Sequence, residues 1–595
     1  MIQFPYGIAD FRRIRRENLL YVDRTAHIHD VERLGSILVF LRPRRFGKSL
    51  WLQTLATYYD LRYSENFDEI FDGLAIGGDP TPRRNRYFVL QWNFSSVTAS
   101  GSIREIAESL HKHVVLQAEL FYADYAGHLE APVKVGDNPD EVLGHLLGAV
   151  RKTPYKLYLL IDEYDNFVNE VMAKDVKTYR ALSDNDGPFK ELFKRVKAAT
   201  EGQGLERIFV TGVSPVALND LTSGFNTATD VSHKEPLATL CGFRDEEIAD
   251  LLQRVAAERD LPQETIERAH LTMRTWYNGY RLTEEADEWV YNPTNALYFL
   301  RELHQTGKPP KSLQDENLRT DRGKLAFLAR TVAGAGVIEQ ITESGDNAIT
   351  AKLVESFSVA DLTKRLGEDR GAIASMLYYM GLLTRTDVPF RLRIPNLVAR
   401  KLFLDRLLEI YLPDHSYDAR DLAMSFFQDG DLSPLLSFFE ERFLPLLSNR
   451  DRGKAPKKPG KSGSGVNETV LKTLFLSILF ADDYYRPFSE PELERGYADL
   501  CLLVREEMRR FQLLDLLFEF KIVRRAATDR KGRELRGMDE AELRKLPAVK
   551  KAFDEAREQA KRYRAALVRR EGERNLRTYA VVVVGLERML GEEVP

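Results

Sequence analysis

The sequence predicts an α/β protein with a parallel sheet covered by helices, a mainly helical middle region and a second α/β domain. Three observations carry this prediction. Short apolar runs alternate with longer amphipathic stretches over roughly the first 240 residues, which is typical of a parallel sheet with helical crossovers. Apolar residues then recur at spacings of three and four, as in helices. A segment rich in Gly, Pro, Ser and Lys, 449–466, indicates a linker before the last domain.

Length and composition exclude several classes of protein. A chain of 595 residues exceeds what one hydrophobic core serves, so three or four domains of about 150 residues are expected. The formal charge of -4 excludes a global basic field, so any contact with a polyanion must be local. Two cysteines, Cys241 and Cys501, exclude a disulfide framework and fit a cytoplasmic protein. No signal peptide and no apolar run of membrane-spanning length is found, so no membrane contact is expected.

The first domain is predicted over 1–243. Its β-type runs are SILVFL (36–41), YFVLQWNF (87–94), LYLLID (157–162) and RIFVTG (207–212). Because longer amphipathic stretches separate these runs, we expect the strands to lie parallel in one sheet.

The loop after the first run has the composition of a phosphate-binding loop. LRPRRFGKSL follows a strand and precedes the helical WLQTLATYY, which is the strand-loop-helix context that such a loop needs. Gly47 leaves room for phosphate, Lys48 reaches the β and γ phosphates, and the hydroxyl of Ser49 is suited to Mg²⁺.

This loop departs from the pattern G-x-x-x-x-G-K-[ST] at the first position, where Arg42 replaces glycine. The loop must therefore turn differently. The guanidinium groups of Arg42, Arg44 and Arg45 either contact phosphate or bind acidic side chains elsewhere in the protein.

A second motif strengthens the nucleotide prediction. LYLLIDEYD is an apolar run that ends in Asp162, which is suited to hold Mg²⁺, and Glu163, which is suited to polarise the attacking water as general base. The alternative is a buried strand that ends in an acidic turn. Thr211, at the tip of RIFVTGVSP, is either a sensor of the γ phosphate or a hydrogen-bonded strand-end threonine. No arginine finger is identified, because Arg244 at the start of an acidic helix fits a surface ion pair better.

A helical region is predicted over 244–448 from the apolar spacing in DEEIADLLQRVAAE and ARKLFLDRLLEIY. Within it, about 357–397 has a winged-helix outline of two short helices, a turn and a hairpin. A packing module between domains is favoured over DNA readout, because the outline carries no information about base contacts.

The last domain is predicted over 467–595. VLKTLFLSILF indicates a buried helix, YADLCLLV and FQLLDLLFEFKIV indicate strands, 548–569 a helix, and TYAVVVVGL a further strand. These elements predict a compact α/β domain.

This last domain contains a pattern suited to metal-dependent phosphodiester cleavage, which needs two or three carboxylates around Mg²⁺ and a nearby cation. Asp499 lies in one predicted strand. Glu519 and Lys521 lie in the next and share a face, because side chains at i and i+2 point the same way. The alternative is an exposed edge strand with a Glu-Lys pair. Cations recur over 524–570, which predicts either a basic surface beside the site or a solvated helix face.

Together these segments resemble the bacterial and archaeal AAA-ATPase-like proteins that carry a C-terminal PD-(D/E)XK nuclease-superfamily domain. The similarity runs through PYGIADFRRIRRENLLYVDRT, RPRRFGKSL, LLIDEYD, TGVSP, GFNTATDVS, WYNGYRL and YNPTNALYFL, and then through Glu468, GYADL, FEFK and EQAKRY. It implies a P-loop NTPase fold of the ASCE/AAA-like type for the first domain and a restriction-endonuclease-like fold for the last.

The resemblance also implies two sets of site residues and the cofactors ATP and Mg²⁺, with Mn²⁺ as an alternative at the nuclease site. The nucleotide set is Arg45, Phe46, Gly47, Lys48, Ser49, Leu50, Asp162 and Thr211, with Mg²⁺ at Ser49 and Asp162 and with Glu163 catalytic. The nuclease set is Glu468, Asp499 and Glu519 as metal ligands, Asp499, Glu519 and Lys521 as catalytic residues, and Gln559 in the pocket. Ala498 stands where the PD pair has its proline. Anchors interpreted as structural are Trp276, Tyr277, Gly279, Asn292 and Pro293.

The leading hypothesis is an ATP-controlled nuclease that acts on nucleic acid, DNA rather than RNA. Analogy suggests a role in mobile-element or phage defence. One rival is a nucleotide-switched protein that grips nucleic acid without cutting it, and another is a scaffold whose loop only holds the domains together. The missing arginine finger favours assembly into a homo-oligomer.

Overall fold

The computed structural model divides into two compact units. The first comprises 1–310, 315–337 and 348–399, and the second comprises 311–314, 338–347 and 400–595. The residues that the structure describes are 1–98, 101–130, 136, 138–166, 187–215, 228–314, 337, 340–341, 348–354, 369–411, 416–444, 475, 478–479, 484–489, 492–493, 496–497, 499–511, 513–572 and 575–595.

The first unit is built on a five-stranded parallel sheet with the order β2-β3-β4-β1-β5. The strands are β1 (Ile37–Leu41), β2 (Tyr87–Asn93), β3 (Lys156–Asp162), β4 (Leu205–Gly212) and β5 (Thr229–Asp230). All four apolar runs that predict strands form strands. The sequence pattern misses β5, because this two-residue edge strand has no apolar residue.

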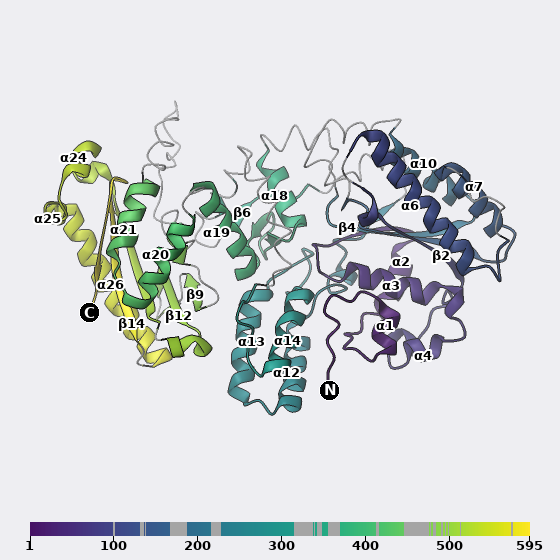
Figure 1. Cartoon of the computed structure of the whole chain (residues 1–595), viewed down its shortest axis with the longest axis horizontal. Coiled ribbons are helices and arrows are strands. Elements are labelled where there is room, and N and C mark those ends of the chain that lie inside the picture. The colour runs from purple at the N-terminus through teal and green to yellow at the C-terminus, as the bar shows by residue number, and fades with distance from the viewer. Residues whose placement is uncertain are drawn as a thin grey trace. The chain divides into compact units, whose positions relative to one another are not determined.

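Helices cover both faces of this sheet (Figure 1). On one side lie α1 (Phe11–Arg16), α2 (His27–Leu34), α3 (Lys48–Tyr59), α4 (Phe67–Phe71) and α5 (Ala75–Gly78). On the other lie α6 (Ile103–Asp124), α7 (Pro139–Val150) and α10 (Pro188–Thr200). Because both faces are covered, successive strand residues are buried whichever way they point, which explains the continuous apolar runs.

The rest of this unit is mainly helical. It contains α12 (Asp245–Arg259), α13 (Gln263–Tyr277), α14 (Pro293–Thr306), α18 (Arg370–Tyr379), the first residues of α19 (Leu397–Tyr411), and the antiparallel strands β6 (Ala348–Thr350), β7 (Thr384–Arg385) and β8 (Arg391–Arg393). The hairpin of the winged-helix outline is present as β7 and β8. The first helix of that outline lies outside the described residues.

The second unit is built on a mixed sheet with the order β15-β14-β13-β12-β9, in which only β13 and β14 run parallel. Its strands are β9 (Tyr485–Ser489), β12 (Leu500–Val504), β13 (Asp515–Val523), β14 (Leu576–Val584) and β15 (Arg588–Glu593), with a separate ribbon of β10 (Glu492–Leu493) and β11 (Gly496–Tyr497). Its helices are α20 (Ser416–Asp429), α21 (Ser433–Phe438), α24 (Gly532–Gly537), α25 (Glu540–Lys545) and α26 (Pro547–Glu571).

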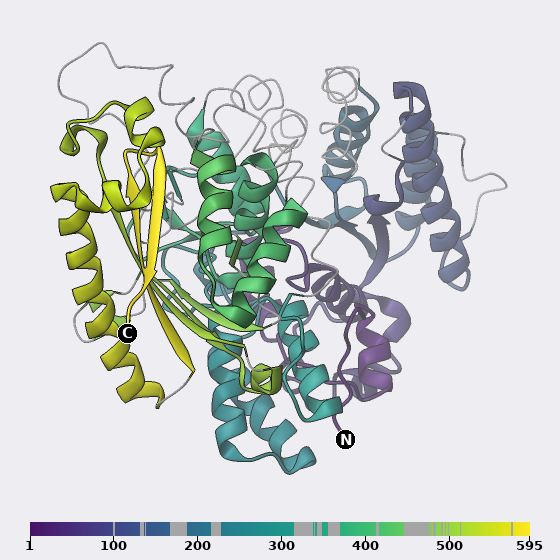
Figure 2. The ribbon, with the colours of Figure 1, turned by 60° about the vertical axis from the view of Figure 1, so that its left-hand side comes forward.

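The long helix α26 lies along one face of this sheet, and α20 and α21 cover the other (Figure 2). Phe426 on α20 packs on Phe518 and Tyr579, with ring centroids 5.9 and 5.4 Å apart. The sequence predicts one helical region over 244–448, whereas α20 and α21 belong to the second unit. The linker at 449–466 and most of VLKTLFLSILF lie outside the described residues. No helix in the described part of the chain combines the length and the apolar character needed to cross a membrane.

Candidate functional sites

The loop between β1 and α3 in the first unit contains two residues with left-handed backbone. Gly47 has a φ of 93° at the start of α3, and Arg45 has a φ of 66°. A Cβ at Gly47 would meet no atom within 4 Å, so the backbone conformation rather than crowding favours glycine there. A non-glycine residue in this conformation costs about 1 kcal/mol or more, and such strain concentrates at functional sites.

Lys48 is the first residue of α3, and its side chain folds back onto the loop. Its Nζ donates to the carbonyl oxygens of Arg42 and Pro43, each at 3.0 Å. The side chain is buried, and this burial lowers the pKa of Lys48, while the charges of Asp162 and Asp165 oppose the shift. An anion that enters the loop offers this ammonium a charged acceptor in place of two neutral ones, which makes a stronger hydrogen bond.

Arg42 has neither of the two roles expected from the sequence, because its guanidinium bonds to backbone carbonyl groups instead of phosphate or an acidic side chain. Its guanidinium points into the core and donates to the carbonyl oxygens of Leu41, Ser232 and Leu237 at 2.9, 2.5 and 2.8 Å. It also lies over the ring of Phe40, 4.3 Å from the centroid, and is only 2% exposed. The arginine therefore anchors the base of the loop from inside the domain.

We expect Arg42→Met to destabilise the first unit by about 4 kcal/mol, because three buried carbonyl groups lose a charged donor. The thermal midpoint should fall by roughly 10 °C. Arg44→Met is the matched control, since Arg44 donates to the side-chain oxygen of Asn166 and lies nearer the surface. Calorimetry of both variants checks the prediction, and equal midpoints for the two would contradict it.

The C-terminal end of β3 carries Asp162, which is 4% exposed. Its Oδ1 accepts hydrogen bonds from the hydroxyl of Thr211 and from the backbone N–H of Glu163. Since β4 lies between β1 and β3, the tip of β4 places Thr211 between the loop and Asp162. Thr211 is therefore a hydrogen-bonded residue at the end of a strand, which is one of the two interpretations that the sequence allows.

Glu163 differs from its neighbour in both backbone and environment. Its φ is 50°, which is left-handed. Burial, and next the negative charge of Asp162, raise the pKa of Glu163, while the charges of Lys48 and Arg44 oppose the shift. A strained residue with a raised carboxyl pKa is typical of a functional position.

A cavity of about 420 Å³ joins the loop to Glu163, and all six loop residues from Arg45 to Leu50 line it. Asp162 and Thr211 are not among its lining residues. Such a volume lies in the range of small-molecule sites. The other walls are the segments 5–9, 20–22 and 240–243 and the start of α14. No sequence motif predicts these walls. Pro293, which is expected from the sequence to be structural, lines the cavity.

The start of α14 is bonded to the loop. The hydroxyl of Thr294 donates to the carbonyl oxygen of Arg45 at 3.2 Å, and the ring of Phe46 meets that of Tyr280 edge to face at 4.9 Å. The other anchors are structural, as predicted: Trp276, Tyr277 and Asn292 are buried, and a Cβ at Gly279 would lie 2.1 Å from the carbonyl oxygen of Pro395.

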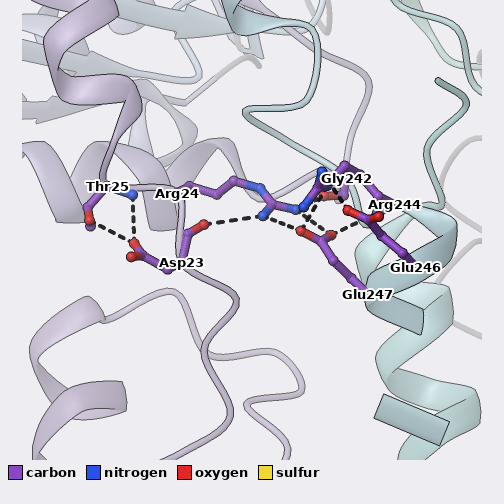
Figure 3. A network of polar contacts seen from close by, with 7 residues as sticks. All are labelled: Asp23, Arg24, Thr25, Gly242, Arg244, Glu246 and Glu247. Carbon is purple, nitrogen blue, oxygen red and sulfur yellow. Dashed lines mark hydrogen bonds and ion pairs between the residues drawn. The ribbon is translucent and has the colours of Figure 1, made fainter. Parts of the chain in front are cut away.

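A partly buried ion pair ties the N-terminal segment to the start of α12 beside this cavity (Figure 3). The two terminal nitrogens of Arg24 each lie 2.7 Å from a carboxylate oxygen of Glu247, and one also donates to the carbonyl of Gly242. Burial alone would raise the pKa of Glu247. The hydrogen bonds and the charge of Arg24 outweigh this effect and hold the pKa below its ordinary value. Arg244 pairs with Glu246 and Glu247 at 2.6 and 3.2 Å, which is the surface ion pair that the sequence favours for it.

In the second unit, β12 and β13 bring the predicted carboxylates together. Leu500 pairs with Phe518 in antiparallel register, so Asp499 lies opposite Glu519 on the same face. The Nζ of Lys521 donates to Glu519 Oε1 at 3.0 Å. The backbone N–H of Phe520 donates to Asp499 Oδ2 at 2.7 Å. Asp499 and Glu519 are 8% and 3% exposed, so the alternative of an exposed edge pair does not hold.

Helix α26 covers this face. Leu517 packs in one apolar cluster with Tyr563, and Val523 packs in another with Phe553 and Ala556, so Glu519 and Lys521 lie between two apolar clusters. Gln559 stands on the same side of α26 as Ala556 and Tyr563, three and four residues away. Its Oε1 is buried and accepts no hydrogen bond from any described residue, which leaves an acceptor available beside the carboxylates.

Two opposed carboxylates and a buried amide oxygen fit Mg²⁺, which binds oxygen ligands and keeps several waters. In the parts of the chain described here, no group of three or more His, Cys, Asp or Glu is placed to hold a metal ion. Glu468, the third predicted ligand, lies outside the described residues.

Two family models match the chain. Residues 5–222 match a family described as predicted AAA-ATPase, and residues 466–593 match the PD-(D/E)XK nuclease superfamily. Among curated proteins, an uncharacterized protein in the vnfD 5′ region of Azotobacter chroococcum is 26% identical over 442 residues, which are 69% of this chain and 71% of that protein.

Two solved structures are also similar. The Walker-type ATPase of Pyrococcus abyssi is 14% identical with a TM-score of 0.37, and the match covers 64% of this chain and 94% of that one. The Orc1 protein of Aeropyrum pernix, solved in complex with DNA, is 12% identical with a TM-score of 0.25 and coverages of 64% and 92%.

Proposed function

Because residues 5–222 are an AAA-ATPase-like domain and residues 466–593 a domain of the PD-(D/E)XK nuclease superfamily, we propose that this protein is an ATP-controlled, Mg²⁺-dependent nuclease. The observation that carries the proposal is the opposition of Asp499 and Glu519, with Lys521 bonded to Glu519. A buried acidic pair is costly unless it is compensated, so its retention between two apolar clusters supports a ligand role.

Each candidate residue of the second unit has its own role in phosphodiester cleavage. When bound, Mg²⁺ supplies a Lewis acid and a water of lowered pKa. Asp499 and Glu519 would hold it, with Glu468 as a third ligand. Phe520 fixes the orientation of Asp499 through its backbone N–H, and Lys521 orients the attacking water or stabilises the charge that develops on the phosphate.

ATP binds in the cavity of the first unit. Gly47 and the N-terminus of α3 receive the phosphates, Lys48 exchanges its carbonyl acceptors for phosphate oxygens, and Ser49 and Asp162 hold Mg²⁺. Arg45, Phe46 and Leu50 shape the loop, and Thr211 orients Asp162. Glu163, which faces the cavity, is the base for the attacking water.

The first test measures cleavage of plasmid, single-stranded DNA and RNA with Mg²⁺ or Mn²⁺, with and without ATP, by the natural chain and by Glu163→Gln. We expect Glu163→Gln to bind ATP but to hydrolyse it at least about 10²-fold more slowly. With ATP present, this variant should then stay in the ATP-bound state, and its rate of DNA cleavage should be the rate of that state. Glu201→Gln, which changes an exposed glutamate at the end of α10 in the same unit, is not expected to change either activity.

The pH dependence of hydrolysis tests the role of Glu163 separately. Glu163 acts as a base only as the carboxylate, and its pKa is raised, so protonation begins at a higher pH than for an ordinary glutamate. ATP hydrolysis should therefore fall as the pH drops through a value above 4.5.

Absence of products from every nucleic acid, with ATP hydrolysis intact, would contradict the nuclease proposal.

The rival is a nucleotide-switched protein that binds nucleic acid without cutting it. DNA rather than RNA as substrate, the homo-oligomer, the cytoplasmic location and the role in defence stay predictions.

A further inference from the structure

The run of cations at 524–570 divides into two parts with different surroundings. In the later part, carboxylates neutralise several cations at close range: Arg536 pairs with Glu587, Arg544 and Arg557 pair with Glu592, and Lys551 pairs with Glu555. These pairs compensate part of the positive charge there, as on an ordinary solvated surface.

The earlier part, 524–533, is different. It carries five cations, Arg524, Arg525, Arg530, Lys531 and Arg533, against the one carboxylate of Asp529. All five cations are exposed. Among the described residues, none of the four arginines forms an ion pair, whereas Arg509, Arg577 and Arg588 of the same unit do. In a chain with a formal charge of -4, this segment is a local concentration of positive charge.

The segment is held firmly at the end of the strand that carries Glu519 and Lys521. Backbone N–H of Gly585 donates to the carbonyl of Val523 at 2.8 Å, which fixes the point where β13 ends. The hydroxyl of Thr528 closes a turn on the carbonyl of Arg525 at 2.7 Å. A Cβ at Gly532 would lie 2.2 Å from Glu587 Oε1, so the far end of the segment packs closely on the β14–β15 turn.

Distance along the chain places the first of these cations, Arg524, near the candidate nuclease site. Arg524 is three residues after Lys521, or about 10 Å at the rise of a β-strand. That separation corresponds to about three phosphates along one strand, at roughly 3.4 Å of helix axis per phosphate.

We propose that the 524–533 segment binds the sugar–phosphate backbone of the nucleic acid and so positions the scissile phosphate at Asp499, Glu519 and Lys521. This inference rests on the proposed nuclease function. Exposed guanidinium groups without carboxylate partners suit phosphate oxygens, to which they donate two parallel hydrogen bonds. Contacts of this kind set the register of the strand and carry no sequence information.

The test measures binding of a duplex DNA of 30 base pairs, a single strand and an RNA of the same sequence by fluorescence anisotropy over a series of salt concentrations. The full chain carries Asp499→Asn in every case, so that the probe stays intact. In the test variant, Arg524, Arg525, Arg530 and Arg533 are also changed to Gln. We expect at least tenfold weaker binding at about 100 mM salt. The slope of the logarithm of the binding constant against the logarithm of the salt concentration should be smaller in magnitude by about 2 to 4.

The matched control removes the same number of exposed cations elsewhere, with Arg254, Arg259, Arg274 and Lys308 changed to Gln. It should bind as tightly as the parent, and both should keep the parent's thermal midpoint. Unchanged affinity in the test variant, or an equal loss in the control, would overturn the inference while the nuclease function stands. If the parent binds none of the three probes, the proposed function fails, and this inference fails with it.

Discussion

Asp499→Asn is expected to lower the rate of phosphodiester cleavage by a factor on the order of 10³ or more. The variant removes one negative charge from the pair that holds the metal ion, and a misplaced or lost metal removes both the Lewis acid and the activated water. A factor of 10³ corresponds to about 4 kcal/mol of transition-state stabilisation.

Asparagine is the informative replacement because Asp499 has two tasks. One carboxylate oxygen accepts the backbone N–H of Phe520 inside the sheet. An alanine would leave that buried N–H without an acceptor, which costs about 1–3 kcal/mol and would mix a folding defect with a catalytic one. Asparagine keeps an acceptor oxygen and removes the charge.

The measurement is single-turnover cleavage of a labelled duplex with Mg²⁺ or Mn²⁺, together with the thermal midpoint. Asp421→Asn on α20 is the matched control, since Asp421 is exposed and lies on the helix that covers the opposite face of the sheet. Cleavage at the natural rate by Asp499→Asn would remove Asp499 from the active site.

The candidate nuclease residues of the second unit could be predicted from the sequence because their arrangement is local. A strand places Glu519 and Lys521 on one face by its period of two, and a charged pair inside LLFEFKIV is conspicuous. The opposition of Asp499 to Glu519 depends on the register of one hairpin. Both strands are largely continuous apolar runs, so their sequences do not set this register and the structure supplies it.

The role of Arg42 was not predictable in the same way. The sequence shows a cation in a loop with the composition of a phosphate-binding loop, so a contact between Arg42 and an anion is expected. In the structure, it bonds to the carbonyl groups of Ser232 and Leu237, which lie about 190 residues away in the chain. Nothing local indicates that these carbonyls lack other donors, so only the tertiary fold shows the anchor.

The walls of the cavity were missed for a related reason. The segments at 5–9 and 240–243 carry no motif of their own, and they become part of the site only because the N-terminal segment folds across the loop. The ion pair of Arg24 with Glu247 helps to hold that arrangement, and its two partners are 223 residues apart. Such a pair has no periodic signal in the sequence.

Lys48→Ala is expected to weaken ATP binding by a factor on the order of 10² to 10³. The ammonium group donates directly to two carbonyl oxygens of the loop, and charged hydrogen bonds contribute about 1.5–3 kcal/mol each. Fluorescent-nucleotide displacement or calorimetry measures the loss. Lys112→Ala, an exposed lysine on α6, is the matched control and should bind as the natural chain does.

The same variant separates the three hypotheses for the chain, because each assigns Lys48 a different consequence. If ATP controls cleavage, Lys48→Ala loses the effect of ATP on DNA cleavage and keeps its thermal midpoint without nucleotide. If ATP controls binding only, the effect of ATP on DNA affinity disappears and no products form with either chain. In the scaffold hypothesis, bound nucleotide stabilises the fold by mass action, so the variant loses the rise in midpoint that ATP gives to the natural chain, while DNA binding and cleavage do not change. Retention of tight ATP binding by Lys48→Ala would contradict all three, since each places the phosphates at this ammonium group.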